Sequence, residues 1–118
     1  IIYKNGFKDE IQKDLGFAIE LFNESIKQKN DSVSMFNLAH IYIFEESLNG
    51  FIKESIKLLL QSAKQNFTPS FQLLTIALIK IYGNNIFDIN NELFVYNNDY
   101  GDILCQIIND VQKFIVFN

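Results

Sequence analysis

The segment AIELFNESIKQ at residues 18–28 returns as SIKLLLQSAKQ at residues 55–65, and this recurrence decides the fold. Ile, Leu, Ser, Lys and Gln are identical in the two copies, at a spacing of 37 residues. A second match follows at a spacing of 36, where SMFNL at 34–38 lies over SFQLL at 70–74. A two-helix unit of this length cannot bury its own apolar stripe, so such units stack and bury it against the next unit.

Most of the chain has the periodicity of helices. Apolar residues recur at helical spacing almost everywhere, and strict alternation is rare. Helix starts are predicted near Asp14 or Leu15, at Asp31 or Ser32, after Asn49-Gly50, at Thr68-Pro69, and finally at Asp99 or Asp102. Asp14 and Asp31 are typical N-caps, because a carboxylate accepts the free amide hydrogens of a first turn. Thr68 is a capping residue as well, and Pro69 loses no hydrogen bond at the first helical position.

The ends of the helices are marked less evenly. Gly83 is predicted to stop the fourth helix in the left-handed conformation. The span 84–98 is Asn-rich and weakly periodic, which predicts a loop or one short helix, and the last helix is expected to run to about Phe114. Connections between the first four helices are short, so consecutive helices must lie antiparallel.

Composition excludes several classes of protein. With 12 Phe, 18 Ile and 48% hydrophobic residues, the 118-residue chain is too apolar for a disordered one. Its single Cys excludes a disulfide framework, and all ten basic residues are Lys, which disfavours nucleic-acid readout because such readout depends heavily on Arg. The longest strongly apolar stretch, residues 73–79, is too short to cross a bilayer, so we expect no direct membrane insertion.

The two-helix pattern resembles the Sel-one-like repeat, a short relative of the tetratricopeptide repeat. That family reads Ala-x-x-x-Leu-Gly-x-x-Tyr-x-x-Gly, a loop with Asp, then Lys-Ala, two bulky residues, Ala-Ala and Gly. SMFNLAHIY supplies Ser34, Leu38, Ala39 and Tyr42, and ESIKLLLQSAKQN supplies Glu54-Ser55, Leu58-Leu59, Ser62-Ala63 and, for the Gly, Asn66. Upstream, Tyr3-Lys4-Asn5-Gly6 matches the Tyr-x-x-Gly corner, Asp14 the loop Asp, and Ala18 and Ser25 the small positions.

The match covers roughly residues 1–83 and departs from the family in places. Glu45 stands where the family has Gly, so that corner must turn differently, and Thr75 and Leu78 replace Gly and Tyr in the following copy. The resemblance implies an all-α, right-handed α-α superhelix, a solenoid of antiparallel helix pairs. We expect a single helical-repeat domain over 1–118, with a partial repeat at 1–30, a repeat at 31–66, and a degenerate repeat plus a C-terminal capping helix at 67–118. The apolar run at 114–117 and the start in mid-unit at Tyr3 lead us to expect a fragment of a longer array.

Candidates for chemistry are few, and each has a plainer interpretation. His40 is the only histidine, and with no partner at ligand spacing it is predicted to be a surface or half-buried helix residue. Cys105 stands among Ile and Leu residues, which predicts a small packing residue without reactivity. Glu45-Glu46 do not converge on a helix, and Asp88-x-Asn90-x-Glu92 lacks the Gly that a calcium loop needs at its sixth position. We therefore predict no enzyme, and no catalytic, cofactor-binding or metal-binding residues.

The resemblance implies a non-catalytic scaffold or adaptor segment that binds a protein or peptide. The first helix of each pair is expected to line the concave side, and its positions outside the repeat core are Asn37, His40 and Phe44, with Leu73, Ile76 and Lys80 at the matched places. The alternative is a structural spacer or capping segment of a larger multidomain enzyme or receptor, and a third class is a small-molecule or lipid binder. We expect a cytoplasmic location, with the endoplasmic reticulum lumen as the alternative that three Asn-x-Ser/Thr triplets slightly favour.

Overall fold

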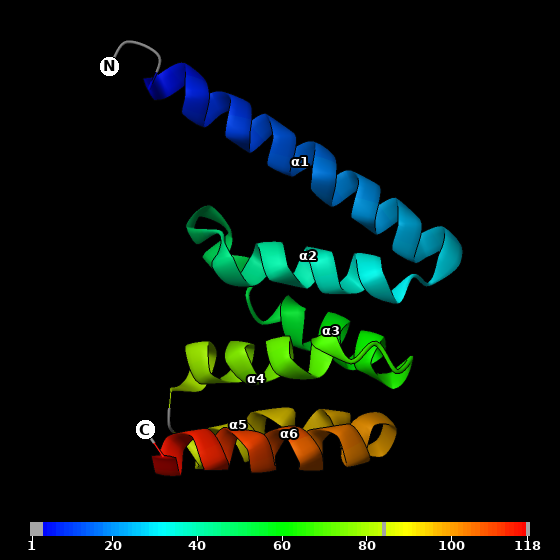
Figure 1. Ribbon diagram of the computed structural model, residues 1–118, viewed down its shortest axis with the longest axis vertical. Coiled ribbons are helices and arrows are strands. Elements are labelled where there is room, and N and C mark those ends of the chain that lie inside the picture. Colours follow the sequence, from blue (N-terminus) through cyan, green and yellow to red (C-terminus); the bar gives the residue numbers. More distant parts are fainter. Residues whose placement is uncertain (1–3, 84, 118) are drawn as a thin grey trace.

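Helices make up all of the regular structure in the described part of the chain, residues 4–83 and 85–117 of this computed structural model. In chain order they are α1 (Lys4–Lys29), α2 (Ser32–Phe44), the 3-10 helix η1 (Glu46–Phe51), α3 (Glu54–Lys64), α4 (Pro69–Tyr82), α5 (Ile86–Leu93), the 3-10 helix η2 (Phe94–Tyr96) and α6 (Asn97–Phe117). Figure 1 shows α1, α2, α3 and α4 stacked in chain order from the top, with α5 and α6 together at the bottom. The all-α prediction is confirmed.

Neighbouring helices in the stack reverse direction. Figure 1 shows α2, α4 and α6 running the same way, each starting at the side where the chain turns after α1, and α3 returning between α2 and α4. α2 packs against α3 and α4, α3 packs against α4 and α6, and α4 packs against α5 and α6. The stack therefore alternates between helices of two directions, as the short connections predict for its first members.

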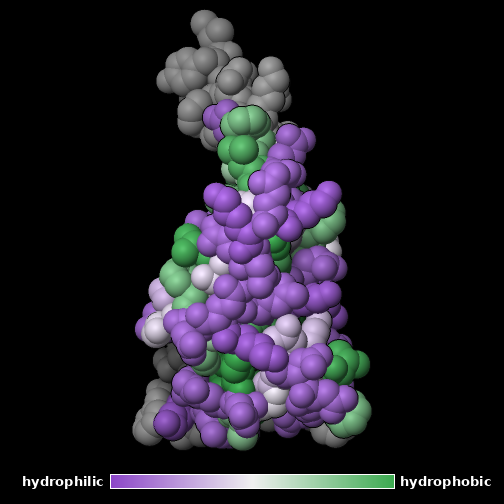
Figure 2. Space-filling view, turned by 90° about the vertical axis from the view of Figure 1, so that its right-hand side faces the viewer, coloured by the Kyte–Doolittle hydropathy of each residue, from purple (hydrophilic) through white to green (hydrophobic). Residues whose placement is uncertain are grey.

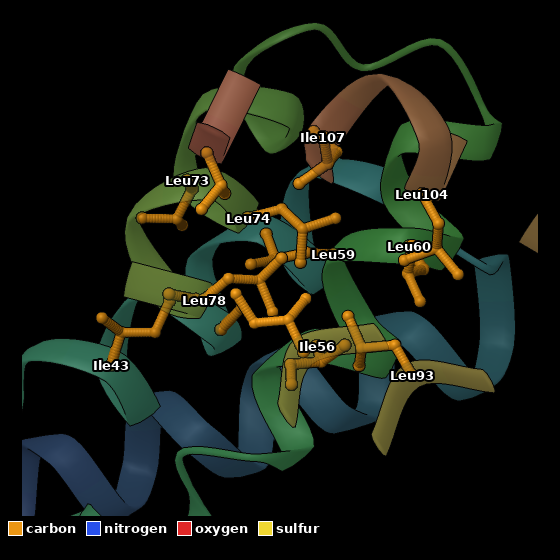
Figure 3. Packing of buried hydrophobic residues seen from close by; sticks show 14 residues of the cluster. Ile43, Ile56, Leu59, Leu60, Leu73, Leu74, Leu78, Leu93, Leu104 and Ile107 are labelled. Carbon is orange, nitrogen blue, oxygen red and sulfur yellow. The ribbon is translucent and has the colours of Figure 1, made fainter. Parts of the chain in front are cut away.

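One apolar cluster runs through the stack from α2 to α6. Its members include Ile43, Leu59, Leu60, Leu74, Leu78, Leu104 and Ile107, each at most 1% exposed, and Figure 3 shows them meeting between the helices. On α3 the buried apolar positions are Ile56, Leu59, Leu60 and Ala63, which is the spacing of one helical face. Of α1, none of residues 14–29 is fully buried, so this part of the helix packs on α2 without entering the core.

Small residues stand where the helices approach one another. The Ser70 hydroxyl donates to the Ser62 hydroxyl at 2.7 Å, and the Ser62 hydroxyl donates to the Ser32 carbonyl at 2.8 Å. Both hydroxyls are fully buried, and these bonds remove the cost of leaving them unpaired. At the matched places one unit earlier, Ser25 and Ser34 both donate to the Asp31 carboxylate, at 3.2 and 2.8 Å.

The two copies also turn alike at their helix ends. Asn30 and Asn66, which lie 36 residues apart, follow the ends of α1 and α3 and have φ of 53° and 67°. Asn tolerates this left-handed region better than most residues, so it can stand where Gly would otherwise end a helix.

Asp31 is the N-cap of α2, as the sequence predicts. Its carboxylate accepts the Val33 amide at 3.1 Å and the Ser34 hydroxyl at 2.8 Å. Hydrogen bonding from Ser34, followed by that from Val33 and Ser25, lowers the pKa of Asp31 below its usual 3.8.

Exposed contacts join the second half of the stack. The Lys53 ammonium lies 3.3 Å from the Glu92 carboxylate, and the Tyr82 hydroxyl and this ammonium together lower the pKa of Glu92. Burial, with the same carboxylate beside it, raises the pKa of Tyr82. Near the other end of α3, the Lys64 ammonium donates to the Asp99 carbonyl at 3.2 Å. Exposed pairs of this kind contribute little to the free energy of folding. They help to orient α5 and α6 but add little to the stability of the fold.

The N-terminal helix is longer than the sequence pattern indicates. α1 begins at Lys4, so Asp14 lies within it and is not an N-cap, and Asn5 and Gly6 are helical instead of forming a corner. Tyr3 lies outside the described residues. No proline interrupts this stretch, and a glycine inside a helix costs only about 1 kcal/mol, which does not stop a 26-residue helix.

Other predicted boundaries hold in part. Pro69 is the first residue of α4, but Thr68 has helical backbone angles and makes no capping hydrogen bond. Gly83 ends α4 with φ of 63°, although its ψ of −127° lies outside the left-handed helical region. The span 84–98 contains the short helix α5. α6 starts at Asn97 and is interrupted at Tyr100 (φ −132°, ψ 21°), so Asp99 and Asp102 flank the break.

The core predicts a large difference between two neighbouring positions of α4. Leu74 is 0% exposed and Ile76 is 46% exposed. We expect Leu74→Ala to lower the free energy of unfolding by about 2–5 kcal/mol through lost burial and a residual cavity. Ile76→Ala, the matched control, should change it by no more than about 0.5 kcal/mol. Urea denaturation of both variants checks this, and equal losses would contradict the packing.

The Asp31 cap predicts a pH-dependent contribution to stability. Since folding lowers the pKa of Asp31, its contribution is fully present above the unfolded value of 3.8 and is lost as the pH falls through the lower folded value. We expect Asp31→Asn to have a lower urea midpoint than the wild type at neutral pH. The gap should close as the pH falls below 3.8, and a gap that stays constant with pH would argue against the charged cap.

Candidate interaction surface

α2, α4 and α6 run in the same direction and present side chains to one side of the stack. We call this surface the α2–α4–α6 face, and it comprises Phe36, His40 and Phe44 of α2, Gln72, Ile76 and Lys80 of α4, and Gln106 and Asp110 of α6. Within each helix these residues are four apart, which puts them on one face. The 36-residue spacing of the repeat matches the α2 row to the α4 row. Side chains of three rows can therefore act on one partner.

The α2 row is an aromatic ladder. The His40 ring centroid lies 4.7 Å from that of Phe44 and 6.3 Å from that of Phe36. Phe36 is half-buried and packs edge-on against Phe67, with the centroids 5.5 Å apart. His40 is exposed, as predicted, and Phe44 is 47% exposed. This row offers rigid aromatic surface to solvent, the kind of area that partner proteins bury.

Lys80 joins the α4 row to the end of α2. Its ammonium donates to the Ile43 carbonyl at 2.6 Å and lies 5.1 Å from the centroid of the Phe44 ring. The carbonyls of a last helical turn lack partners within the helix and carry partial negative charge, so a cation is favourable there. Lys80 thus provides a hydrogen-bond donor to a carbonyl at the C-terminal end of α2 and makes a cation–π contact with the Phe44 ring.

An open groove of about 530 Å³ lies between α4 and α6. Its lining residues are Thr68, Phe71, Gln72, Thr75, Ile76, Gln106 and Asp110. Phe71 and Ile76 form the apolar part, and Gln106 and Asp110 form the polar wall on α6. The Thr75 hydroxyl is already bonded to the Phe71 carbonyl at 3.1 Å. The other polar groups of the lining are the Thr68 hydroxyl, the side-chain amides of Gln72 and Gln106, and the Asp110 carboxylate.

Five of the six predicted partner-binding residues are accessible to some degree. His40, Phe44, Ile76 and Lys80 are exposed on the α2–α4–α6 face, and Asn37 is half-buried beside it. Leu73 is only 5% exposed and belongs to the apolar core, so its side chain is not offered to a partner. Position 73 falls on the side of α4 that meets the core, because a helix turns by about 100° per residue and Leu73, Leu74 and Ala77 share that side.

The α6 wall of the groove is absent from the sequence prediction. The sequence pattern places Gln106 and Asp110 in the predicted C-terminal capping helix, outside any repeat motif, but both line the groove. Their only sequence signal is their i, i+4 spacing on the polar side of α6. That side becomes a wall of the groove only because α6 packs against α4. The wall can therefore be recognised only in the folded structure.

A second hollow, of about 430 Å³, lies among α1, α2, η1 and α3. Its lining residues are Asn23, Leu38, Tyr42, Phe51, Glu54, Lys57, Leu58 and Gln61. The Tyr42 and Phe51 rings stack with centroids 5.7 Å apart. Burial, with the Glu54 carboxylate nearby, raises the pKa of Tyr42, so this phenol stays neutral at ordinary pH. The hollow is open and mixed in polarity, without a nucleophile next to a base.

The remaining chemical candidates are scattered. Asp88, Asn90 and Glu92 lie on α5, a helix and not a calcium loop, and Asp88 accepts a hydrogen bond from Asn85. Within residues 4–83 and 85–117, no group of three or more His, Cys, Asp or Glu side chains is arranged to hold a metal ion. None of the helices in these stretches combines the length and apolarity that crossing a membrane requires.

The side of the molecule seen in Figure 2 is mainly hydrophilic. Apolar side chains form separate small patches there, and α1 narrows the upper part where it leaves the stack. The helix turns gather on this side, near the start of α2 and the start of α6.

Cys105 is exposed, so the prediction that it is a small packing residue is wrong. Leu104 and Ile107 face the core from α6, and Cys105 falls on the other side of that helix. We expect a disulfide reagent such as Ellman's reagent to react with one thiol in the folded chain about as fast as in urea. A reaction that becomes much faster only after unfolding would contradict this placement.

Among the described residues that line the groove and form the aromatic ladder, no nucleophile lies next to a base and no cluster of metal ligands is present. No family model, no curated protein and no solved structure matches this chain.

Proposed function

We propose that this chain is a non-catalytic segment of a helical-repeat scaffold that binds a partner protein on its α2–α4–α6 face. The proposal extends to the architecture, a right-handed superhelix of Sel-one-like repeats. It is supported by the left-handed backbone of Asn30 and Asn66, which recurs at the repeat spacing. Hydrogen-bonded serines also occupy matched places: Ser25 and Ser34 both donate to the Asp31 carboxylate, and Ser70 donates to Ser62. Stacks of such pairs offer extended faces for binding.

The single observation that carries the binding role is the exposure of bulky apolar side chains in adjacent rows. Phe44 is 47% exposed on α2 and Ile76 is 46% exposed on α4, beside a groove of about 530 Å³. Bulky apolar side chains that stay exposed among polar groups often mark sites where proteins bind each other. Lys80 and His40 supply the polar groups around it.

We also propose a cytoplasmic location. Cys105 is an exposed, unpaired thiol, and such thiols persist in compartments that keep cysteines reduced.

A second candidate, a structural spacer or capping segment, is favoured by α1. Phe17 is 63% exposed and Leu21 is 54% exposed, one turn apart on this helix. An apolar helix face open to solvent suits a segment that packs against a neighbouring domain. In that case the α2–α4–α6 face would have no partner.

The binding proposal is tested by affinity capture with matched variants. The double variant Phe44→Ser and Ile76→Ser removes the exposed apolar side chains of the face. The control is Phe94→Ser with Val95→Ser, because these residues are even more exposed, at 71% and 75%, but lie on η2. Lysate proteins captured by immobilised wild-type chain are quantified by mass spectrometry.

We expect proteins retained by the wild type and the control to be reduced at least about tenfold on the double variant, a loss of about 1.4 kcal/mol or more. Thermal unfolding should show both double variants within a few degrees of the wild type, since none of the four residues is buried. Equal capture by both variants, or capture by none of the chains, would favour the spacer.

A further inference from the structure

We propose that the groove between α4 and α6 binds a segment of the partner that carries a bulky apolar side chain next to a Lys or Arg. This inference rests on the proposed function and names the chemistry that the face recognises. The apolar side chain packs on Phe71 and Ile76, and the cationic group pairs with the Asp110 carboxylate.

The apolar half of the groove is built on α4. Phe71 is half-buried and packs against the core, so its position is fixed from below, whereas Ile76 is 46% exposed. Together they offer a supported apolar surface with one accessible edge. Covering it releases water from apolar area without any rearrangement of the core.

The acidic half lies on α6. Asp110 is half-buried at the wall of the groove, and Gln106 stands one turn before it. Among the side chains that the structure describes, no ammonium group lies within 4.0 Å of this carboxylate. Lys113, three residues further along α6, is exposed and makes no such pair.

The nearest cation of the α4 row is committed elsewhere. The Lys80 ammonium is bound to the Ile43 carbonyl at 2.6 Å and to the face of Phe44, both on α2. The charge along the α2–α4–α6 face is thus divided, with the cation against α2 and the free carboxylate in the groove. A partly buried carboxylate attracts a cation more strongly than a fully solvated one, because fewer water molecules screen it.

The groove is also long enough for such a segment. Along α4 its lining runs from Thr68, the residue before the helix, to Ile76, and a rise of eight residues corresponds to roughly 12 Å along the helix. That length accommodates about two turns of a partner helix or about four residues of extended chain. An apolar and a basic side chain can be placed within it at once.

The test uses the full 118-residue chain and peptides selected on it from a random display library. Enriched peptides are synthesised with a fluorescent label, and their dissociation constants are measured by fluorescence polarisation. The variants are Asp110→Asn, which removes the charge, and Asp110→Lys, which reverses it. The matched control is Asp14→Asn, an exposed aspartate on α1 away from the groove.

We expect the enriched peptides to share a Lys or Arg close to a bulky apolar residue. Asp110→Asn should weaken their binding about tenfold, and Asp14→Asn should leave it unchanged. Asp110→Lys should abolish binding, and replacing the basic residue of the peptide by Glu should restore it to that variant. This rescue by exchanged charges would not follow if Asp110 only supported the fold.

Two outcomes would overturn the inference, and they differ in what they say about the proposed function. In the first, the peptides lose affinity for the Phe44→Ser and Ile76→Ser variant but bind Asp110→Asn normally. This result would support binding on the α2–α4–α6 face but refute the pairing of a Lys or Arg with Asp110. Failure to enrich any peptide that depends on either site would refute both.

Discussion

The structure depends on the burial of α3 between neighbours on both sides. Leu59 and Leu60 are completely buried, and α3 packs against α2 and α4 as well as α6. α2 alone could not cover this apolar stripe of α3. Its complete burial therefore also requires α4 and α6. The buried Ser62 and Ser70 set how closely the layers approach, because their hydroxyls bond each other and need no space for water.

Much of this arrangement could be predicted from sequence because its signals are local. The 3.6-residue period, Asp31 as a cap and Pro69 at a helix start depend on neighbours within one turn, and the structure confirms each of them. The start of α1 could not be predicted, because Asp14 has the chemistry of a cap but nothing before it breaks the helix. Cys105 was misjudged for a related reason: apolar neighbours in sequence do not decide which side of a helix a residue occupies.

The candidate site was predictable to a smaller extent. The repeat spacing identifies His40, Phe44, Ile76 and Lys80, which are exposed, but it also selects Leu73, which the core buries. The contact of Lys80 with the Ile43 carbonyl and the wall formed by Gln106 and Asp110 depend on how α2, α4 and α6 stack. Residues from separate helices share a site only through tertiary packing, and a single sequence carries no direct record of that.

The shallow packing of α1 has a consequence for how the molecule opens. Residues 14–29 include none that is fully buried, while every later layer contributes to one continuous core. Since local opening costs least free energy where little apolar surface is buried, the layer formed by α1 separates from the stack most easily. Amide hydrogens of α1 should therefore exchange with solvent through local opening, long before those of α3, whose exchange must wait for the whole stack to unfold. The molecule has a directional gradient of stability, lowest at the end formed by α1.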